Sequence, residues 1–125
     1  AERRLLGLCG LKIVSRPGAP VDGLTEIGWR LREDAWGMGY AREAAEATLN
    51  LGFLRFGLDS IIAMTVRQNA PSWGLMQRLG FVRARALDHR IAGLDPEITD
   101  HIVYSIDRKE WATRQALQQK PRLAR

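Results

Sequence analysis

The sequence predicts a single α/β domain built around a mixed, twisted β-sheet. A strand–helix–strand unit between Thr25 and Val66 is the first indication, because such a unit makes its two strands parallel with a right-handed crossover. The second is a pair of strands near the C-terminus, which can close the sheet after another helix. The chain has 125 residues, 46% of them hydrophobic. That length fits one domain with one core.

The N-terminal half divides into two strands and a helix. Leu5 to Val14 reads as a strand, and the segment from Ser15 to Gly23, with two prolines and two glycines, reads as a loop. Thr25 to Leu31 is a second strand, which we expect to pair antiparallel with the first. From Tyr40 to Phe56 apolar residues recur at helical spacing, and Gly57 is placed to end this helix.

The C-terminal half supplies the rest of the sheet. The apolar run from Ile61 to Val66 predicts a strand covered on both faces. A helix is expected from about Ala70 to Leu79, with a proline in its first turn, where proline is tolerated. Phe81 to Asp88 and Ile98 to Ile106 are predicted as a closing strand pair. A last short helix, capped by Asp107, is expected to pack back through Trp111. We expect the domain to span residues 1–116, with residues 117–125 as a frayed basic tail.

Composition narrows the function classes. The net charge is +5, which suits acidic partners such as nucleotide phosphates. The arginines are spread along the chain, and the one locally basic segment, Arg114 to Arg125, lacks interleaved aromatics, so no specific nucleic-acid surface is predicted. No segment approaches the roughly 20 apolar residues of a membrane span. Cys9 is the single cysteine, so we expect a buried, inert thiol and a cytoplasmic protein. His89 and His101 have no third ligand at metal spacing, and no metal site is predicted.

The most informative segment runs from Glu26 to Glu43, Glu-Ile-Gly-Trp-Arg-Leu-Arg-Glu-Asp-Ala-Trp-Gly-Met-Gly-Tyr-Ala-Arg-Glu. It reads as a strand, a glycine-containing turn and the start of a helix. A helix N-terminus carries unpaired N–H groups and a partial positive charge. Gly37 and Gly39 remove side chains where a phosphate would approach. The segment therefore predicts either a diphosphate cradle or a tight turn shaped by its glycines.

A second segment, Asn69-Ala-Pro-Ser-Trp-Gly-Leu-Met-Gln-Arg-Leu-Gly-Phe81, follows the apolar strand. Together the two segments resemble the GNAT-type N-acetyltransferases, which use acetyl-coenzyme A. The diphosphate loop of that superfamily reads Gln/Arg-x-x-Gly-x-Gly/Ala, and Trp36 to Ala41 fits it except at Trp36. Glu-Ile-Gly-Trp-Arg-Leu, Asn-x-x-Ser and Leu-Gly-Phe look most like the branch that acetylates ribosomal-protein N-termini. The resemblance extends from about Leu5 to Trp111.

The resemblance implies a GNAT-like acyl-CoA N-acyltransferase fold and a set of residues that hold acetyl-CoA. The diphosphate loop includes the small residues Gly37, Gly39 and Ala41. Arg42, in the same loop, either adds positive charge near a phosphate or faces solvent. The strand whose backbone pairs with the pantetheine arm falls on Ile27 to Leu31, and Asn69 either bonds the arm or caps the following helix. The implied cofactor-binding residues are Ile27, Gly28, Trp29, Leu31, Gly37, Met38, Gly39, Tyr40, Ala41, Arg42, Asn69 and Ser72.

Two residues are candidates for proton transfer. Amine acetylation requires a neutral amine, and Glu26 matches the branch's glutamate before Ile-Gly-aromatic, which suits a general base. The alternative is a solvated carboxylate at the strand end. Ser72 matches the branch's serine and is a candidate to protonate the leaving thiolate; its alternative is a bond to its own helix backbone. Many superfamily members use a tyrosine four residues later, where this chain has Met76.

The resemblance also frames the rival functions. The superfamily fold begins with a strand and two helices that are not seen before Leu5, so an N-terminally incomplete domain is expected. The predicted reaction is transfer of acetyl from acetyl-CoA to a primary amine, on a protein N-terminus or a small molecule, and a homodimer is left open. The rivals are a non-catalytic acyl-CoA-binding module and a basic nucleic-acid-associated protein. A dinucleotide enzyme is disfavoured because the third glycine and an acidic ribose ligand are missing.

Overall fold

A computed structural model describes residues 7–31, 39–91 and 100–119 of the chain. The elements follow in the order β1 (Gly7–Ile13), β2 (Thr25–Leu31), α1 (Tyr40–Asn50), the π-helical turn η2 (Leu51–Arg55), β3 (Ser60–Val66), α2 (Ala70–Leu79), β4 (Val82–Arg83), the 3-10 turn η3 (Arg85–Leu87), β5 (His89–Arg90), β6 (Asp100–Asp107) and α4 (Arg108–Gln119). None of the helices in these ranges is long and apolar enough to cross a membrane.

The strands form one mixed sheet in the order β1-β2-β3-β6-β4, with β5 beside β6. β1 and β2 pair antiparallel over their full length, β2 and β3 are parallel, and β3 and β6 are antiparallel. The predicted α/β fold with a mixed sheet is confirmed, as is the parallel strand–helix–strand unit. Both bounds of β2 and both bounds of α2 agree with the sequence prediction.

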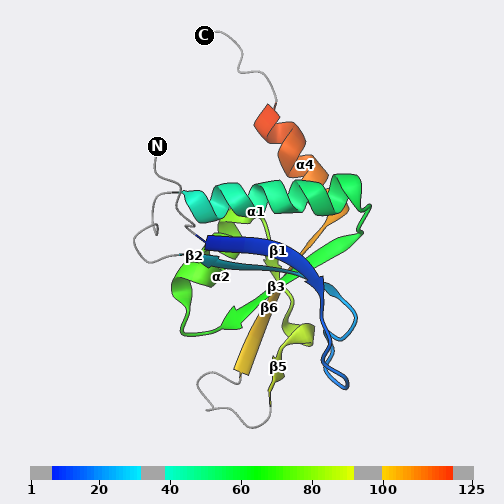
Figure 1. The fold of residues 1–125 in the computed structure, drawn as a ribbon, viewed down its shortest axis with the longest axis vertical. Helices are drawn as coiled ribbons and strands as arrows, with labels where there is room; N and C mark the ends of the chain where they lie inside the picture. The colour runs from blue at the N-terminus through cyan, green and yellow to red at the C-terminus, as the bar shows by residue number, and fades with distance from the viewer. Residues whose placement is uncertain (1–6, 32–38, 92–99, 120–125) are drawn as a thin grey trace.

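β2 and β3 meet near their starts and then diverge. Their ladder registers one residue pair, Glu26 with Ile62, although each strand is seven residues long. Figure 1 shows the two strands separating toward the side where β2 ends. Beyond Glu26, the side of β2 that faces β3 therefore has backbone groups without a ladder partner in that strand. Such groups need another partner, from protein, water or ligand.

The main core lies between the sheet and its helices. α1 lies along β1 and β2, with α4 beyond it (Figure 1). Buried side chains of α1, α2 and the sheet meet there, and the ring of Trp111 from α4 stacks on Phe53 with centroids 5.0 Å apart. The predicted inward residues of α2, Leu75, Met76 and Leu79, are all buried. Helix stability here comes from this packed face rather than from propensity alone.

A smaller cluster covers part of the opposite face. Ile62 of β3 and Val103 of β6 pack there against Val14 and Val21 from the loop between β1 and β2. The central strand β3 is thus covered on both faces, as its continuous apolar run predicts. Successive side chains of a strand alternate between faces. Residues of β1 and β2 that do not enter the main core therefore point to this second face.

Two sequence predictions were wrong in detail. The predicted strand from Phe81 to Asp88 is interrupted: β4 has two residues, and the 3-10 turn η3 follows. The Asp88 carboxylate accepts a hydrogen bond from the Val103 backbone N–H at 2.9 Å, which replaces a strand contact. Phe56 is 61% exposed rather than inward. The chain widens to a π turn before it, with the Phe56 N–H bonded to Leu51 O, so the helical spacing shifts there.

The last helix begins as predicted but is longer. The Glu110 N–H donates to the Asp107 carboxylate at 2.7 Å, which caps the first turn. α4 then continues to Gln119, past the predicted boundary at residue 116. Trp111 is 7% exposed and packs back onto the core, as expected.

Candidate functional site

Both α1 and α2 begin at the edge toward which β2 and β3 diverge (Figure 1). Because β2 and β3 are parallel, their carboxyl ends lie at the same edge of the sheet, and each strand leads into one of these helices. The carboxyl edge of parallel strands is where open α/β sheets bind ligands. The two helix N-termini also place unpaired N–H donors and partial positive charge there.

Gly39 precedes α1 in the left-handed conformation, with φ 80°. A residue with a Cβ is strained at such a φ, and the Gly39 carbonyl accepts from the Glu43 N–H at 3.0 Å. A Cβ built at Gly39 would meet no other described atom within 4 Å. The backbone thus favours glycine here, and no described atom lies where a side chain would begin. Gly37 and Met38, predicted in the same loop, lie outside the described residues.

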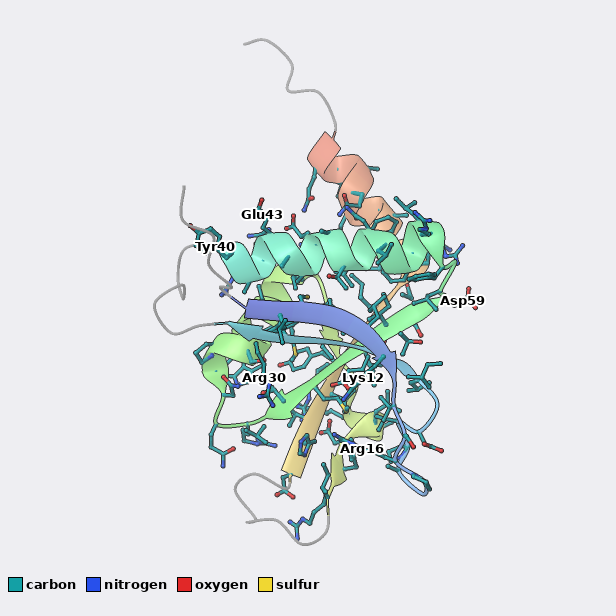
Figure 2. All side chains as sticks on the ribbon, viewed as in Figure 1. Lys12, Arg16, Arg30, Tyr40, Glu43 and Asp59 are labelled. Atoms are coloured by element: carbon teal, nitrogen blue, oxygen red, sulfur yellow. The ribbon has the colours of Figure 1, made fainter. Side chains whose placement is uncertain are left out.

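The next three predicted residues differ in what they can offer. The Tyr40 side chain is 39% exposed at the start of α1 (Figure 2). Ala41 packs against the main core. The Arg42 Nε donates to the carboxylate of Glu46 one turn along the helix, at 3.0 Å. The Arg42 charge is therefore paired along the helix, and the first turn of α1 also offers backbone N–H groups as donors.

The predicted residues of β2 offer backbone rather than side chains. Ile27 is 2% exposed within the main core, and Trp29 packs against the same core. Gly28 is exposed, and a Cβ built on it would meet no atom within 4 Å. Leu31 ends the strand, and its backbone alone is described. These positions fit a role in which strand amides meet an amide-rich ligand.

Asn69 is the N-cap of α2, with its Oδ1 accepting from the Ser72 N–H at 3.4 Å. The capping alternative is thus realised, and the exposed amide nitrogen remains available. The Ser72 hydroxyl has no hydrogen-bond partner among the described residues. Thr48 and Thr113, in contrast, bond the carbonyl four residues earlier. The alternative in which Ser72 bonds its own helix backbone is therefore not what the structure contains.

Glu26 lies where β2 and β3 still pair. Its residue is 9% exposed, and its Oε1 is buried without a hydrogen-bond partner among the described residues. The Lys12 Nζ is 3.8 Å from that oxygen, from the directly opposite position on β1. The predicted alternative, a solvated carboxylate at the strand end, does not fit this burial. A buried carboxylate oxygen without a hydrogen bond is costly, and it is suited to accept a proton or a donor.

A histidine cluster lies on the same face of the sheet. The rings of His89 and His101 stack with centroids 5.7 Å apart. The Arg16 guanidinium lies 2.8 Å from His89 Nε2 and 3.8 Å from Met64 Sδ. The described residues contain no group of three histidine, cysteine or acidic side chains that could hold a metal ion.

Cys9 is half-buried on the core side of β1, where the Thr48 hydroxyl lies 3.3 Å from its sulfur. Burial raises the pKa of the Cys9 thiol above its ordinary value, with smaller opposing contributions from the hydrogen bonds of Thr48 and Gly10. A raised pKa reduces the thiolate fraction, so this thiol is a weak nucleophile. It is a packing residue, in keeping with the sequence prediction.

Sequence reasoning did not single out Lys12 and Arg16. Lys12 is a charged residue within an otherwise apolar strand, which indicates that its side chain faces away from the core. In the antiparallel pair of β1 and β2 it lies beside Glu26. Arg16 gave no signal, because its contacts with Met64 and His89 join residues 48 and 73 positions apart. Figure 2 shows Lys12, Arg16 and Arg30 on the side of the sheet away from α1.

Known proteins resemble this chain in sequence. A sequence profile described as an acetyltransferase (GNAT) domain matches residues 1–82. An uncharacterized N-acetyltransferase p20 of Bacillus licheniformis is 29% identical over 109 residues, or 86% of this chain and 58% of that protein. The N-acetyltransferase YnaD of Bacillus subtilis is 35% identical over 86 residues, or 69% of this chain and 50% of that protein.

A solved structure supports the same fold. Ribosomal-protein-S5-alanine acetyltransferase from Vibrio fischeri superposes with a TM-score of 0.67 at 22% identity, covering 85% of this chain and 56% of that chain. This is a likeness of fold. The chain spans about half the length of the curated relatives it matches. With the profile match over residues 1–82, the sheet topology and the glycine turn, the chain belongs to the GNAT acetyltransferase domain family.

Proposed function

We propose that this chain binds acetyl-CoA where β2 and β3 diverge and transfers its acetyl group to a primary amine. The observation that carries the proposal is that β2 and β3 register one residue pair near their starts and then diverge toward the edge where α1 and α2 begin. An amide-containing chain inserted there would satisfy the free strand backbone. Diphosphate oxygens would accept from the N–H groups at the start of α1.

The residues present fit this donor. Gly39 keeps the helix start free of a side chain, and the exposed Gly28 does the same along β2. Tyr40, Ala41 and Arg42 supply the first backbone groups of α1. Asn69 supplies an exposed amide at the start of α2. Acetyl-CoA contributes the activated thioester, and the chain's own residues orient it and handle protons.

Glu26 is proposed as the general base. The amine nitrogen forms a bond to the acetyl carbon, the carbon–sulfur bond breaks, and the amine proton must leave. Glu26 Oε1 is buried and accepts no hydrogen bond from a described residue, so it can take that proton directly or through water. Lys12 Nζ lies 3.8 Å from this oxygen, and its positive charge would disfavour a protonated amine beside it.

Ser72 is proposed to give a proton to the leaving coenzyme A thiolate. Its hydroxyl is not used by the helix that it begins, and its N–H is held by Asn69, which fixes the residue's position. Met76 occupies the position one turn later and is 1% exposed in the core. A thioether donates no proton, so Ser72 is the available acid among these two.

A thermal-shift experiment tests the donor. Acetyl-CoA at about 100 times its Kd should stabilise the folded chain by about 2.7 kcal/mol through mass action. NAD at equal concentration should give no shift, because the turn lacks the features of a dinucleotide site. Thiol release with a panel of amines then tests transfer. Binding without release from any amine would favour the non-catalytic acyl-CoA-binding module.

The nucleic-acid alternative has a separate test. Dispersed arginines support only weak, non-specific binding, whose logarithm should fall with the logarithm of salt concentration. Tight, sequence-selective binding at physiological salt would favour that alternative over the acetyltransferase. The acceptor's identity, a cytoplasmic location and a homodimer stay predictions; light scattering in solution tests the last of these.

A further inference from the structure

The second face of the β1–β2 pair has a position without side chains at its centre. Gly10 and Gly28 are directly paired across the two strands, and a Cβ built at either would meet nothing within 4 Å. The pair Leu8 and Arg30 lies on one side of these glycines along the strands. We call this surface, from Leu8, Gly10 and Lys12 to Glu26, Gly28 and Arg30, the glycine strip.

The charges at the two ends of the glycine strip are unequal. At one end Glu26 is balanced by Lys12, 3.8 Å from its carboxylate oxygen. At the other end Arg30 is exposed and has no ion-pair partner among the described residues. Glu26 is the one acidic residue in the sequences of β1 and β2. Arg16 adds a further positive charge on the same side of the sheet (Figure 2).

Two acidic residues in the described part of the chain near this face accept hydrogen bonds from backbone N–H groups. Asp22 accepts from the Arg16 backbone N–H at 2.8 Å. Asp88 accepts from Val103 N–H and is paired with Arg83. Among the described residues, the unpaired side-chain charge nearest the glycines is that of Arg30.

We infer that the glycine strip receives the acceptor as an extended peptide N-terminus with acidic residues a few positions after its amine. The inference rests on the proposed function, since it takes Glu26 as the end where the amine reacts. Glu26 and Arg30 are four residues apart along β2, or roughly 13 Å at strand spacing. An extended peptide with its amine at Glu26 would bring its fourth or fifth residue to Arg30.

The Gly10–Gly28 pair allows an extended backbone to approach the two strands closely between the flanking side chains. A polyamine would place positive charges against Arg30 and Lys12, and like charges at an interface are unfavourable. An acidic peptide gains attraction at Arg30 while its neutral amine meets Glu26. The acceptor class is therefore set by charge at the far end of the glycine strip.

Three fluorescent peptides of one design test the inference. They are Ala-Gly-Gly-Glu-Glu-Gly, Ala-Gly-Gly-Gln-Gln-Gly and Ala-Gly-Gly-Arg-Arg-Gly, each labelled at the C-terminus. Binding is measured by anisotropy at low salt with acetyl-CoA omitted, and transfer by thiol release with acetyl-CoA present. The acidic peptide should bind about tenfold more tightly than the basic one, with the neutral peptide between them.

Matched arginine variants locate the effect. Arg30→Gln should remove most of the difference between the acidic and basic peptides. Arg55→Gln, at an exposed arginine on η2, should leave it unchanged. Equal binding of the three peptides, or loss of the preference in both variants, would overturn the inference. Equal acetyl transfer to the three peptides, with no binding preference, would overturn the inference about acidic peptides but would support the proposed acetyl transfer. A preference that Arg30→Gln removes, without any thiol release, would confirm acidic-peptide binding at the glycine strip and overturn both the proposed transfer and the assignment of that peptide as its acceptor.

Discussion

Arg16 holds His89 across the second face of the sheet, with its Nη1 2.8 Å from the His89 Nε2. A guanidinium has no acceptor, so His89 Nε2 is the acceptor of this bond. The His89 proton is then on Nδ1, which lies 3.0 Å from the Leu87 carbonyl and donates to it. The loop between β1 and β2 is thereby joined to β5.

Nitrogen-15 NMR should detect His89 as the neutral Nδ1–H tautomer. Arg16→Met keeps a long apolar side chain but removes the guanidinium. In this variant the His89 nitrogen signals should indicate exchange between the Nδ1–H and Nε2–H tautomers. The His101 signals serve as the internal reference. A dominant Nε2–H form of His89 in the parent protein would contradict the arrangement, because both nitrogens would then lack their partners.

Cys9 should react slowly with thiol reagents in the folded protein. Burial raises its thiol pKa, so less thiolate is present at a given pH, and the rate should rise as pH increases toward that higher pKa. Because the thiol has the lower pKa in the unfolded state, the unfolded state ionises first as pH rises. The contribution of Cys9 to the free energy of unfolding therefore falls as pH rises from the unfolded pKa through the folded one. Reaction as fast as in denaturant would contradict the burial.

Glu26→Gln should lower turnover by about 100- to 10,000-fold, the usual contribution of a positioned base. The substitution keeps the side chain's shape while removing its charge. Affinity for acetyl-CoA should be nearly unchanged, because Glu26 lies where β2 begins and Gly39 lies beyond its end. Steady-state kinetics and calorimetry measure the two quantities.

Higher pH should partly rescue Glu26→Gln, because the amine then arrives without its proton. Glu110→Gln, on the exposed surface of α4, is the matched control and should keep parental turnover. Full activity in Glu26→Gln would remove Glu26 from the chemistry and leave its burial to be explained by folding.

Ser72→Ala should slow turnover without rescue at high pH, since its proposed proton goes to the leaving thiolate rather than from the amine. The helix should stay folded, because Asn69 caps it through the Ser72 backbone N–H, which alanine keeps. Circular dichroism and thiol release separate the two effects. Parental turnover in Ser72→Ala would show that the thiolate leaves without a proton from this residue.

The sequence predicts much of the fold because local signals and tertiary packing agree. Asn69 and Pro71 mark the start of α2, and Gly80, with φ 99°, marks its end. The failures arise where side chains override the pattern. Asp88 takes the Val103 N–H and interrupts a predicted strand. The π turn η2 rotates Phe56 to the surface.

The candidate site was predictable where a motif marks it and unpredictable where it depends on distant contacts. Gly39 and Glu26 stand in recognisable segments, and the structure adds the left-handed φ of one and the burial of the other. Lys12 and Arg16 reach the site by strand pairing and by long-range contacts. No local sequence pattern encodes such contacts. The arrangement of charged side chains on the second face therefore could not be predicted without the structure.

Calorimetric binding of acetyl-CoA to the parent, Gly39→Ala and Gly18→Ala tests the central claim most directly. Both glycines have left-handed φ values, 80° and 87°, and a Cβ added at either would meet open space, so alanine strains each by a similar amount, about 1–2 kcal/mol. Only Gly39 borders the proposed donor site. We expect the parent and Gly18→Ala to bind acetyl-CoA alike and Gly39→Ala to bind at least tenfold more weakly. No binding by the parent, or equal affinity in both variants, would contradict the claim.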